Sequence, residues 1–408
     1  MFGFGQREVQ DRFSMDAIGK PYRFVPPRFG RFIPSLLQRC LPWYMDRKYG
    51  IEHWEVRGAK GLRASIDAGH GVILTPNHSR DSDSVGIGFT GIRASTFPHF
   101  MAGWHVLLES RFQQFIIPRA GGFSVLREGN DRKSVRTAID LVAQNSRPLI
   151  LFPEGYVTRT NDRLGNLQEG AVLIARQAAS QRARKNNGLA VVHPVIIKYQ
   201  FCGDFQKVAE SKLARLEKNL SLSKDPSAAL IGRLERVREA IIRDREKIAL
   251  GEASGSLLEK RVPILIDALL NPLEEAWGRI NDAKDTYDRV RKLRLVILEH
   301  STNKDVIEEE NRRLHRQLAQ CTWALKLSSY DPDYLAKEPC VERYMETLDS
   351  LEEDVFGSIQ VTRPWRMVLK IGNVIPVSPR DKMLGQQLKE SMEKQLATLA
   401  TEFNHPLP

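Results

Sequence analysis

The stretch VILTPNHSRDSDS, residues 72–84, decides the fold of this chain and the position of its chemistry. An apolar run typical of a buried strand ends at Pro76, and a polar turn rich in helix N-cap residues follows it. His78 and Asp83 therefore lie at the carboxyl edge of a strand, where α/β sheets build their sites. If the turn brings the two side chains together, the carboxylate fixes the histidine tautomer and raises the basicity of the other ring nitrogen.

The spacing of this pair specifies little by itself, because His300 and Asp305 repeat it. That second pair lies in a charged helical stretch with no strand before it, and five helical steps turn through about 140°. We interpret His300 and Asp305 as part of a solvated face. For His78 and Asp83 the alternative is a capped turn with an incidental histidine, and only further motifs can decide.

Around this stretch, strand-like runs alternate with helical runs. The strand-like runs are IEHWEVRG from residue 51, HFMAGW from 99, GGFSVLR from 121, RPLILFPEG from 147 and LAVVHPVIIKYQF from 189. Helical runs are LLESRFQQFII from 107, KSVRTAIDLVAQ from 133 and EGAVLIARQAASQ from 169. This alternation predicts an α/β fold, with a sheet flanked by helices on both faces.

The sequence pattern changes over residues 204–355, where long, charged helical runs replace the alternation of strands and helices. Two apolar stripes step by four, three and four residues: Leu230, Leu234, Val237, Ile241, and Leu314, Leu318, Cys321, Leu325. They are helix-packing faces or short coiled-coil seams, and in the second case copies of the chain could self-associate through them. Strand character returns in RMVLKIGNVIPVSP, residues 366–379, before a closing helix.

We predict four parts from this pattern. An N-terminal helical segment covers 1–50, and the sheet domain covers 51–203. A large helical insertion follows over 204–355, and residues 356–408 complete the sheet domain with its last strand and a helix. The last strand is expected to pair back into the sheet of the first part.

The net charge of +11 and the pI of about 9.5 suggest an anionic partner: nucleic acid, a membrane surface or an anionic substrate. The insertion carries 26 Lys+Arg and 30 Asp+Glu, so the positive charge lies in the other parts of the chain. Four widely spaced cysteines indicate reduced thiols, and no metal-binding pattern occurs. We expect no secretory signal and no transmembrane helix.

The N-terminal segment from residue 21 to residue 48 mixes aromatic and basic residues. This profile is typical of a segment that lies in a membrane interface. The alternative is a helical hairpin packed on the core. The first interpretation predicts a cytoplasmic protein attached peripherally to the inner face of the membrane.

Several familiar motifs are absent or misplaced. No GxSxG elbow surrounds Ser79, Ser82 or Ser84, so capping is the expected role of these serines. A literal GxGxxG covers residues 86–91, but it does not follow a strand directly, as a dinucleotide site requires. No cofactor is therefore indicated.

Four blocks of the chain, taken together and in order, resemble the glycerolipid acyltransferase family that includes 1-acyl-glycerol-3-phosphate acyltransferases. Its NHxxxxD motif is matched by Asn77, His78 and Asp83, and its glycine-to-arginine block by Gly122 through Arg127. Its FPEG motif is matched by residues 152–155, and its hydrophobic proline block by residues 192–195. KIGNVIPV, residues 370–377, resembles the strand that follows in that family.

The resemblance implies a mechanism and a set of roles. His78 would deprotonate the acceptor hydroxyl, which attacks an acyl thioester, and Asp83 would orient His78. Arg127 would hold the acceptor phosphate. Glu154, Gly155, Gly122 and Asn77 would contribute to substrate binding. A glycerol hydroxyl gains from a base poised near neutral pH, and a thioester needs no metal.

The chain departs from the family in two places. FPEG commonly continues into Thr-Arg-Ser, whereas Tyr156 and Val157 here precede Thr158 and Arg159. Arg159 is a candidate second phosphate ligand that stands later than the family pattern places it. The long insertion is not typical of the family either.

The resemblance implies that the chain makes phosphatidic acid from lysophosphatidic acid, with acyl-CoA or acyl-carrier protein as the donor. Acylation of glycerol-3-phosphate or of another lysolipid is the alternative within the class. A non-catalytic scaffold that binds nucleic acid is the alternative from another class. The acidic balance of the long helices and the lack of an RNA-binding signature argue against a nucleic-acid partner.

Overall fold

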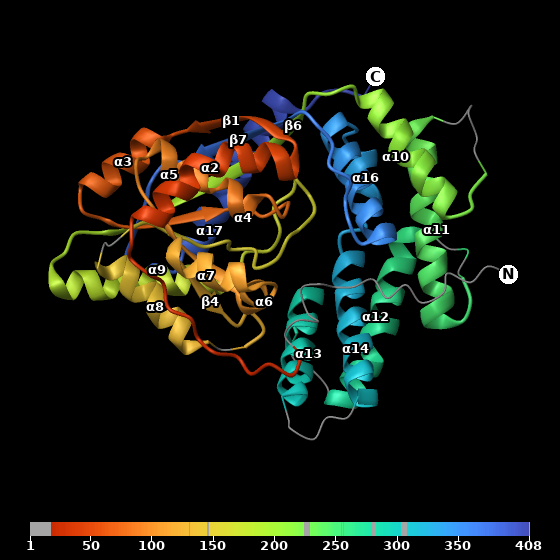
Figure 1. Cartoon of the computed structure of the whole chain (residues 1–408), viewed down its shortest axis with the longest axis horizontal. Helices are drawn as coiled ribbons and strands as arrows, with labels where there is room; N and C mark the ends of the chain where they lie inside the picture. The colour runs from red at the N-terminus through yellow and green to blue at the C-terminus, as the bar shows by residue number, and fades with distance from the viewer. Residues whose placement is uncertain are drawn as a thin grey trace.

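The computed structural model describes residues 18–129, 131–144, 147–223, 229–253, 255, 257–278, 283–302 and 308–407. One mixed sheet is flanked by helices, and a column of further helices stands beside it (Figure 1). The predicted α/β class is therefore confirmed. Residues 1–17 of the predicted N-terminal segment and Asp305 of the second histidine–aspartate pair lie outside the described residues.

The sheet has the strand order β1-β7-β6-β2-β5-β3-β4, and β8 also pairs with β6. The strands are β1 (Ile51–Arg57), β2 (Gly71–Pro76), β3 (His99–Gly103), β4 (Gly122–Val125), β5 (Leu149–Ile150), β6 (Ala190–Phe201), β7 (Trp365–Ile371) and β8 (Ile375–Val377). Pairing is antiparallel where β6 meets β7 and β8, and parallel elsewhere. The sheet is therefore mostly parallel, so its carboxyl edge can gather side chains from several strands.

The strand β6 joins the two ends of the sheet domain. Its first half pairs with β2, and its second half pairs with β7, which follows the insertion in sequence. The chain leaves the sheet after Phe201 and returns at Trp365, and these two residues are register partners. The strand expected after the insertion thus does join the sheet of the first part, while the division into domains stays a prediction.

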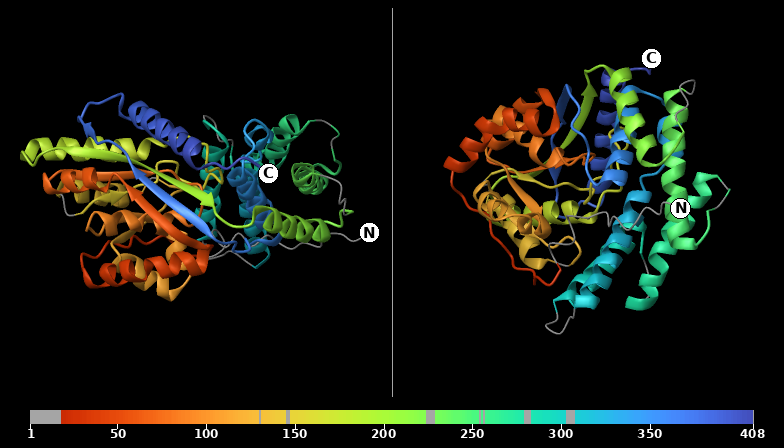
Figure 2. Two further views of the ribbon diagram at one scale, coloured as in Figure 1. Left: turned by 90° about the horizontal axis from the view of Figure 1, so that it is seen from above. Right: turned by 45° about the vertical axis from the view of Figure 1, so that its right-hand side comes forward.

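Both faces of the sheet are covered by helices (Figure 2). Leu74 and Val191 belong to one apolar cluster, and their neighbours Ile73 and Val192 belong to the other. Alternate residues of a strand point to opposite faces, so a strand buried on both faces is apolar throughout. The helices are α2 (Phe32–Tyr49), α3 (Ala59–Asp67), α4 (Asp83–Gly86), α5 (Gly88–Arg93), α6 (Trp104–Leu108), α7 (Arg111–Arg119), α8 (Arg132–Gln144), α9 (Glu169–Lys185) and α17 (Leu384–Phe403).

The single helix predicted from residue 107 to residue 117 is wrong. The helix α6 ends at Leu108, and α7 begins at Arg111. Ser110 separates them because its extended backbone makes it an N-cap, and its hydroxyl accepts a hydrogen bond from the Gln113 N–H at 3.1 Å. Among the described helices, none combines the length and the apolarity needed to cross a bilayer.

The insertion is helical, as predicted. Its helices are α10 (Phe205–Asn219), α11 (Leu230–Leu250), α12 (Leu258–Trp277), α13 (Thr286–Ser301), α14 (Glu308–Leu327), α15 (Pro332–Ala336) and α16 (Val341–Phe356). Leu234, Val237, Leu314 and Leu318 of the two apolar stripes are buried within the chain. The stripes are therefore helix-packing faces, and self-association stays a prediction that would need another surface.

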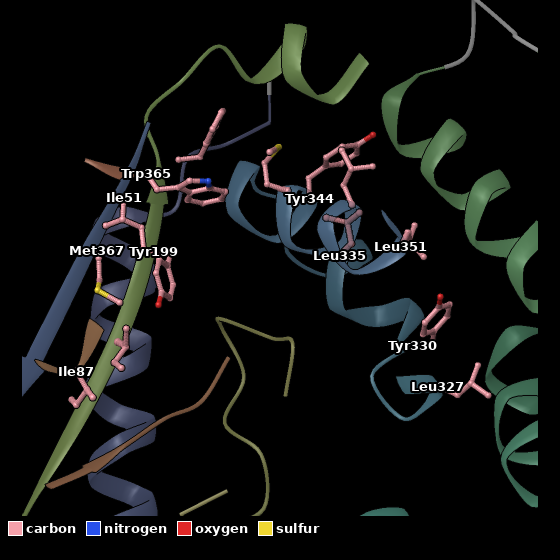
Figure 3. Packing of buried hydrophobic residues seen from close by; sticks show 14 of the residues in the cluster. Ile51, Ile87, Tyr199, Leu327, Tyr330, Leu335, Tyr344, Leu351, Trp365 and Met367 are labelled. Carbon is pink, nitrogen blue, oxygen red and sulfur yellow. The ribbon is translucent and has the colours of Figure 1, made fainter. Parts of the chain in front are cut away.

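One apolar cluster continues from the sheet into the insertion (Figure 3). Tyr199 and Trp365 of the sheet belong to the same cluster as Tyr344 and Leu351 of α16. The insertion is thus packed against the core and is not a separate arm.

A buried carboxylate adds a polar connection at this junction. Asp162 pairs with Lys198 of β6, accepts a hydrogen bond from Arg343 of α16 at 2.9 Å, and accepts another from Asn404 at 2.7 Å. Burial would raise the pKa of Asp162, but Lys198 and Arg343 outweigh it and hold that pKa below its usual value. Asp162 therefore links the sheet, the insertion and the end of the chain.

Replacing Asp162 by Ala should be strongly destabilising. Lys198 has a side-chain exposure of 0% and would lose its ion-pair partner, which typically costs about 3–5 kcal/mol. Urea unfolding measures the change. The control is Glu393→Ala, which breaks an exposed pair with Lys389 and should cost less than about 1 kcal/mol. Equal unfolding midpoints for the two variants would contradict the role of Asp162.

Candidate active site

His78 and Asp83 are brought together by the turn that follows β2. The Nδ1 atom of His78 lies 3.3 Å from the Oδ2 atom of Asp83, with side-chain exposures of 11% and 0%. The six residues of β2 are all buried, and the strand ends at Pro76. The predicted proximity of the pair is thus observed at the carboxyl edge of the sheet.

Backbone and side-chain donors surround the carboxylate of Asp83. Its Oδ2 atom accepts hydrogen bonds from the N–H groups of Ser79 at 2.6 Å and Arg80 at 2.8 Å. Its Oδ1 atom accepts one from the Tyr199 hydroxyl. A carboxylate only accepts, so Nδ1 of His78 carries the hydrogen and Nε2 keeps its lone pair. This arrangement leaves Nε2 as the basic nitrogen.

Tyr199 belongs to the hydrogen-bond network of Asp83, and sequence reasoning missed it. It is fully buried, and its hydroxyl accepts a hydrogen bond from Ser82 at 2.8 Å while donating to Asp83. Burial and the nearby Asp83 raise its pKa well above the usual value. The strand β6 has twelve residues and β2 has six, so the second half of β6 runs past Pro76 beside the polar turn. Only this register places Tyr199 here.

Ser82 does not have the predicted capping role. It occupies the N-cap position of α4, but its side chain makes no cap hydrogen bond. The Tyr199 hydroxyl takes it instead. Ser82 therefore contributes to the network that holds Asp83.

The side chains of Asn77 and Glu154 brace the backbone, and the substrate-binding roles that the resemblance implied for them stay predictions. The Asn77 amide accepts from the Ile197 N–H at 2.7 Å and donates to the Ile197 carbonyl at 3.1 Å. The Glu154 carboxylate accepts from the N–H groups of His78 and Gly165, both at 2.6 Å. Buried backbone groups beyond a strand end lack ladder partners, and these two side chains satisfy them. Glu154 thereby positions the backbone of His78.

A cavity of about 2100 Å³ opens in front of His78. Arg127, Gly155 and Arg159 also line it. Gly155 has a φ of +81°, and a Cβ atom there would lie 2.8 Å from the Tyr287 hydroxyl, so glycine is required twice over. Gly122 lies within β4, where a Cβ atom would meet the Phe100 ring at 2.6 Å. Glycine at this position permits close packing, and its predicted contact with substrate stays a prediction.

The two candidate phosphate ligands differ in their surroundings. Arg127 is partly buried, and its Nη1 atom lies 3.5 Å from the Gly155 carbonyl oxygen. Arg159 forms ion pairs with Glu353 at 2.8 Å and Asp354 at 3.1 Å, both in α16. Two carboxylates of the insertion thus pair with the Arg159 guanidinium, and its role as a second phosphate ligand stays a prediction. Arg159 connects the FPEG loop to the insertion.

The insertion also supplies one wall of the cavity through α13, the helix beside the core in Figure 1. The Tyr287 hydroxyl donates to the Gly155 carbonyl at 3.4 Å, and its ring stacks on Tyr156 with centroids 4.7 Å apart. Arg291 donates to the Glu128 carbonyl at 2.9 Å, and Arg294 lies 3.4 Å from the Glu128 carboxylate. Sequence reasoning gave no signal for these contacts, because more than 130 positions separate the partners in each of them.

Comparison with known proteins gives one family. A family model described as Acyltransferase matches residues 53–198. This span contains the histidine–aspartate turn, the Arg127 block and the FPEG loop, and it ends within β6. The insertion and β7 lie outside the matched residues. A comparison with curated proteins found no match.

The titration of Glu154 should be visible in the stability of the fold. Burial raises its pKa to about 7, although the N–H groups of His78 and Gly165 oppose this. The folded chain then holds a proton that an unfolded carboxyl with the ordinary pKa has already lost. Stability therefore falls as the pH rises from about 4.5 to about 7. Glu154→Gln does not titrate, so its urea midpoint should fall less over this range.

The comparison is made at pH 5 and pH 7.5. Burial raises the pKa of Glu346 to about 7 as well, so the variant should keep part of the pH dependence. A midpoint that falls as far in Glu154→Gln as in the unchanged protein would assign the titration to other groups.

Proposed function

We propose that this chain, whose residues 53–198 match the Acyltransferase family model, transfers an acyl group from an acyl thioester to the hydroxyl of lysophosphatidic acid. The product is phosphatidic acid. The observation that carries the proposal is the His78–Asp83 pair, which faces a large cavity shared with Arg127. Acyl-CoA and acyl-carrier protein both remain candidate donors.

His78 acts as the general base in this proposal. Its Nε2 atom takes the proton of the acceptor hydroxyl as the oxygen attacks the thioester carbonyl carbon. The tetrahedral intermediate then collapses, the carbon–sulfur bond breaks, and the thiolate takes the proton from the imidazolium. Asp83 stabilises that imidazolium, and the donors from Ser79, Arg80 and Tyr199 hold its oxygens in place.

The cavity has the size and the lining for lipid chains. Pockets for small ligands usually measure about 300–1,000 Å³, and this one measures about 2100 Å³. Leu41, Ile116 and Phe152 contribute apolar lining, and Arg127 contributes a cation suited to a phosphate. Glycerol-3-phosphate or another lysolipid would use the same cation, so the acceptor has to be identified by assay.

We propose that an apolar face of α2 and α7 contacts the membrane. Phe32 and Trp43 of α2 are 78% and 65% exposed, and Phe112 of α7 is 68% exposed. Exposed rings that large usually mark an interaction surface. Arg31 and Arg39 of the same region are exposed and can pair with anionic lipid headgroups.

This apolar face lies at the entrance of the cavity. Trp43 and Phe112 are exposed and also line the cavity. An acyl chain could therefore pass from the lipid layer to His78 without crossing water. The proposed attachment is peripheral, at the inner face of the membrane.

His78→Ala should abolish acyl transfer while the fold survives, since a general base typically contributes about 10²–10⁴-fold. Asp83→Asn should cost less, because the base remains and only its orientation is weakened. The assay uses a labelled acyl donor with lysophosphatidic acid, glycerol-3-phosphate and other lysolipids as acceptors. His300→Ala is the control and should keep full activity. If the His78→Ala variant is folded and keeps full activity, His78 is not the general base.

Trp43→Ser combined with Phe112→Ser should weaken binding to anionic vesicles by tenfold or more. Each buried ring contributes roughly 1.5–3 kcal/mol. Deleting the N-terminal segment is not a fair test, because Ser124 donates to the Val25 carbonyl and Met45 is buried in the core. Co-sedimentation with vesicles measures the effect, and high salt should weaken the remaining binding.

The matched control is Ile248→Ser, which removes an apolar side chain 66% exposed on α11 of the insertion. It should leave vesicle binding unchanged. If the control weakens binding as much as the double variant does, the membrane contact lies elsewhere.

A further inference from the structure

Charged residues from the core and from α13 line the same cavity. Arg127 and Glu128 come from the core, and Asp288, Arg291, Lys292 and Arg294 come from α13. Four are cations and two are anions, so the group has a net charge of +2. A phosphate monoester carries about −1.5 to −2 near pH 7, which this charge complements.

Both acidic residues of the group interact with its basic residues. Glu128 lies 3.4 Å from Arg294 and uses its carbonyl to accept from Arg291. Asp288 is shared by Arg291 at 2.8 Å and Lys292 at 2.9 Å. The two acids thus hold the arginine side chains in place against the cavity without cancelling the positive charge.

Arg127 and His105 lie side by side over Gly103. A Cβ atom at Gly103 would lie 2.8 Å from the Arg127 guanidinium and 2.5 Å from the His105 ring, so both side chains pass close to this backbone. Burial, followed by the charges of Arg127 and Arg294, holds the pKa of His105 well below its usual value. His105 is therefore neutral between two arginines that come from the core and from the insertion.

We propose that Arg291 and Arg294 of α13 join Arg127 to form a three-arginine site for the phosphate monoester of the acceptor. This inference rests on the proposed acyl transfer and extends it. The insertion then determines acceptor specificity, although it lies outside the residues that match the family model. Guanidinium groups suit this role because each can bind phosphate through two parallel N–H donors.

Two matched probes test the phosphate contact in the full chain without acyl transfer. Hexanoyl lysophosphatidic acid carries the phosphate, and monohexanoylglycerol lacks it. Calorimetry should show that the unchanged protein prefers the first. Arg291→Gln and Arg294→Gln should each reduce the preference roughly tenfold or more. The affinity ratio is insensitive to a partly unfolded sample, and Arg→Lys at both positions should restore part of it.

The control is Arg289→Gln on the same helix. Arg289 pairs with Glu274 and Asp267 inside the insertion, away from the cavity lining, so its variant should keep the preference. Kinetics then assign the phosphate to a substrate. A rise in KM for lysophosphatidic acid alone supports the acceptor site, whereas a rise for the donor alone overturns it in favour of the donor phosphate.

The failures of the two proposals are distinguishable. An unchanged preference in both glutamine variants, in a protein that transfers acyl groups, overturns the three-arginine site and leaves the function intact. A preference lost in these variants, in a protein that acylates none of the acceptors, retains the phosphate site and overturns the function.

Discussion

The buried carboxylate of Asp162 is the interaction on which the placement of the insertion depends. It accepts from Lys198 in the sheet and from Arg343 in α16, and burial makes each of these bonds costly to lose. Arg159 adds a second connection through Glu353 and Asp354. Because the helices of the insertion pack on one another, fixing α16 also fixes α13 against the cavity. A wall of the site thus depends on a contact made outside it.

Buried hydrogen bonds also hold the turn that carries His78. Beyond the end of β2 the Glu154 and Asp83 carboxylates accept from the N–H groups of His78 and Ser79, and the Asn77 side chain accepts from the Ile197 N–H of β6. Each of these bonds is buried, so the turn has little freedom to rearrange. His78, which we propose as the base, is therefore oriented by the fold itself, and such orientation favours proton transfer.

The charge at the cavity differs from the charge that the sequence of the insertion suggests. The insertion is acidic on balance, yet it presents Arg291 and Arg294 to the cavity. Many of its acids pair with its own basic residues or, as in the case of Asp354, with the core. The net charge of the insertion therefore did not predict the charge that it presents to the cavity. Ion pairs form between individual neighbouring side chains, and a sum over the whole segment does not record which charges are paired.

The sequence by itself determined what depends on neighbouring residues. Periodicity indicated the strands and most helices, and the short turn from His78 to Asp83 allowed their proximity to be predicted. Tertiary structure alone decided that Tyr199 reaches Asp83, that Glu154 accepts from the backbone, and that Arg291 and Arg294 line the same cavity as Arg127. These contacts depend on strand register and on packing between segments far apart in the chain, and local sequence patterns predict neither of them.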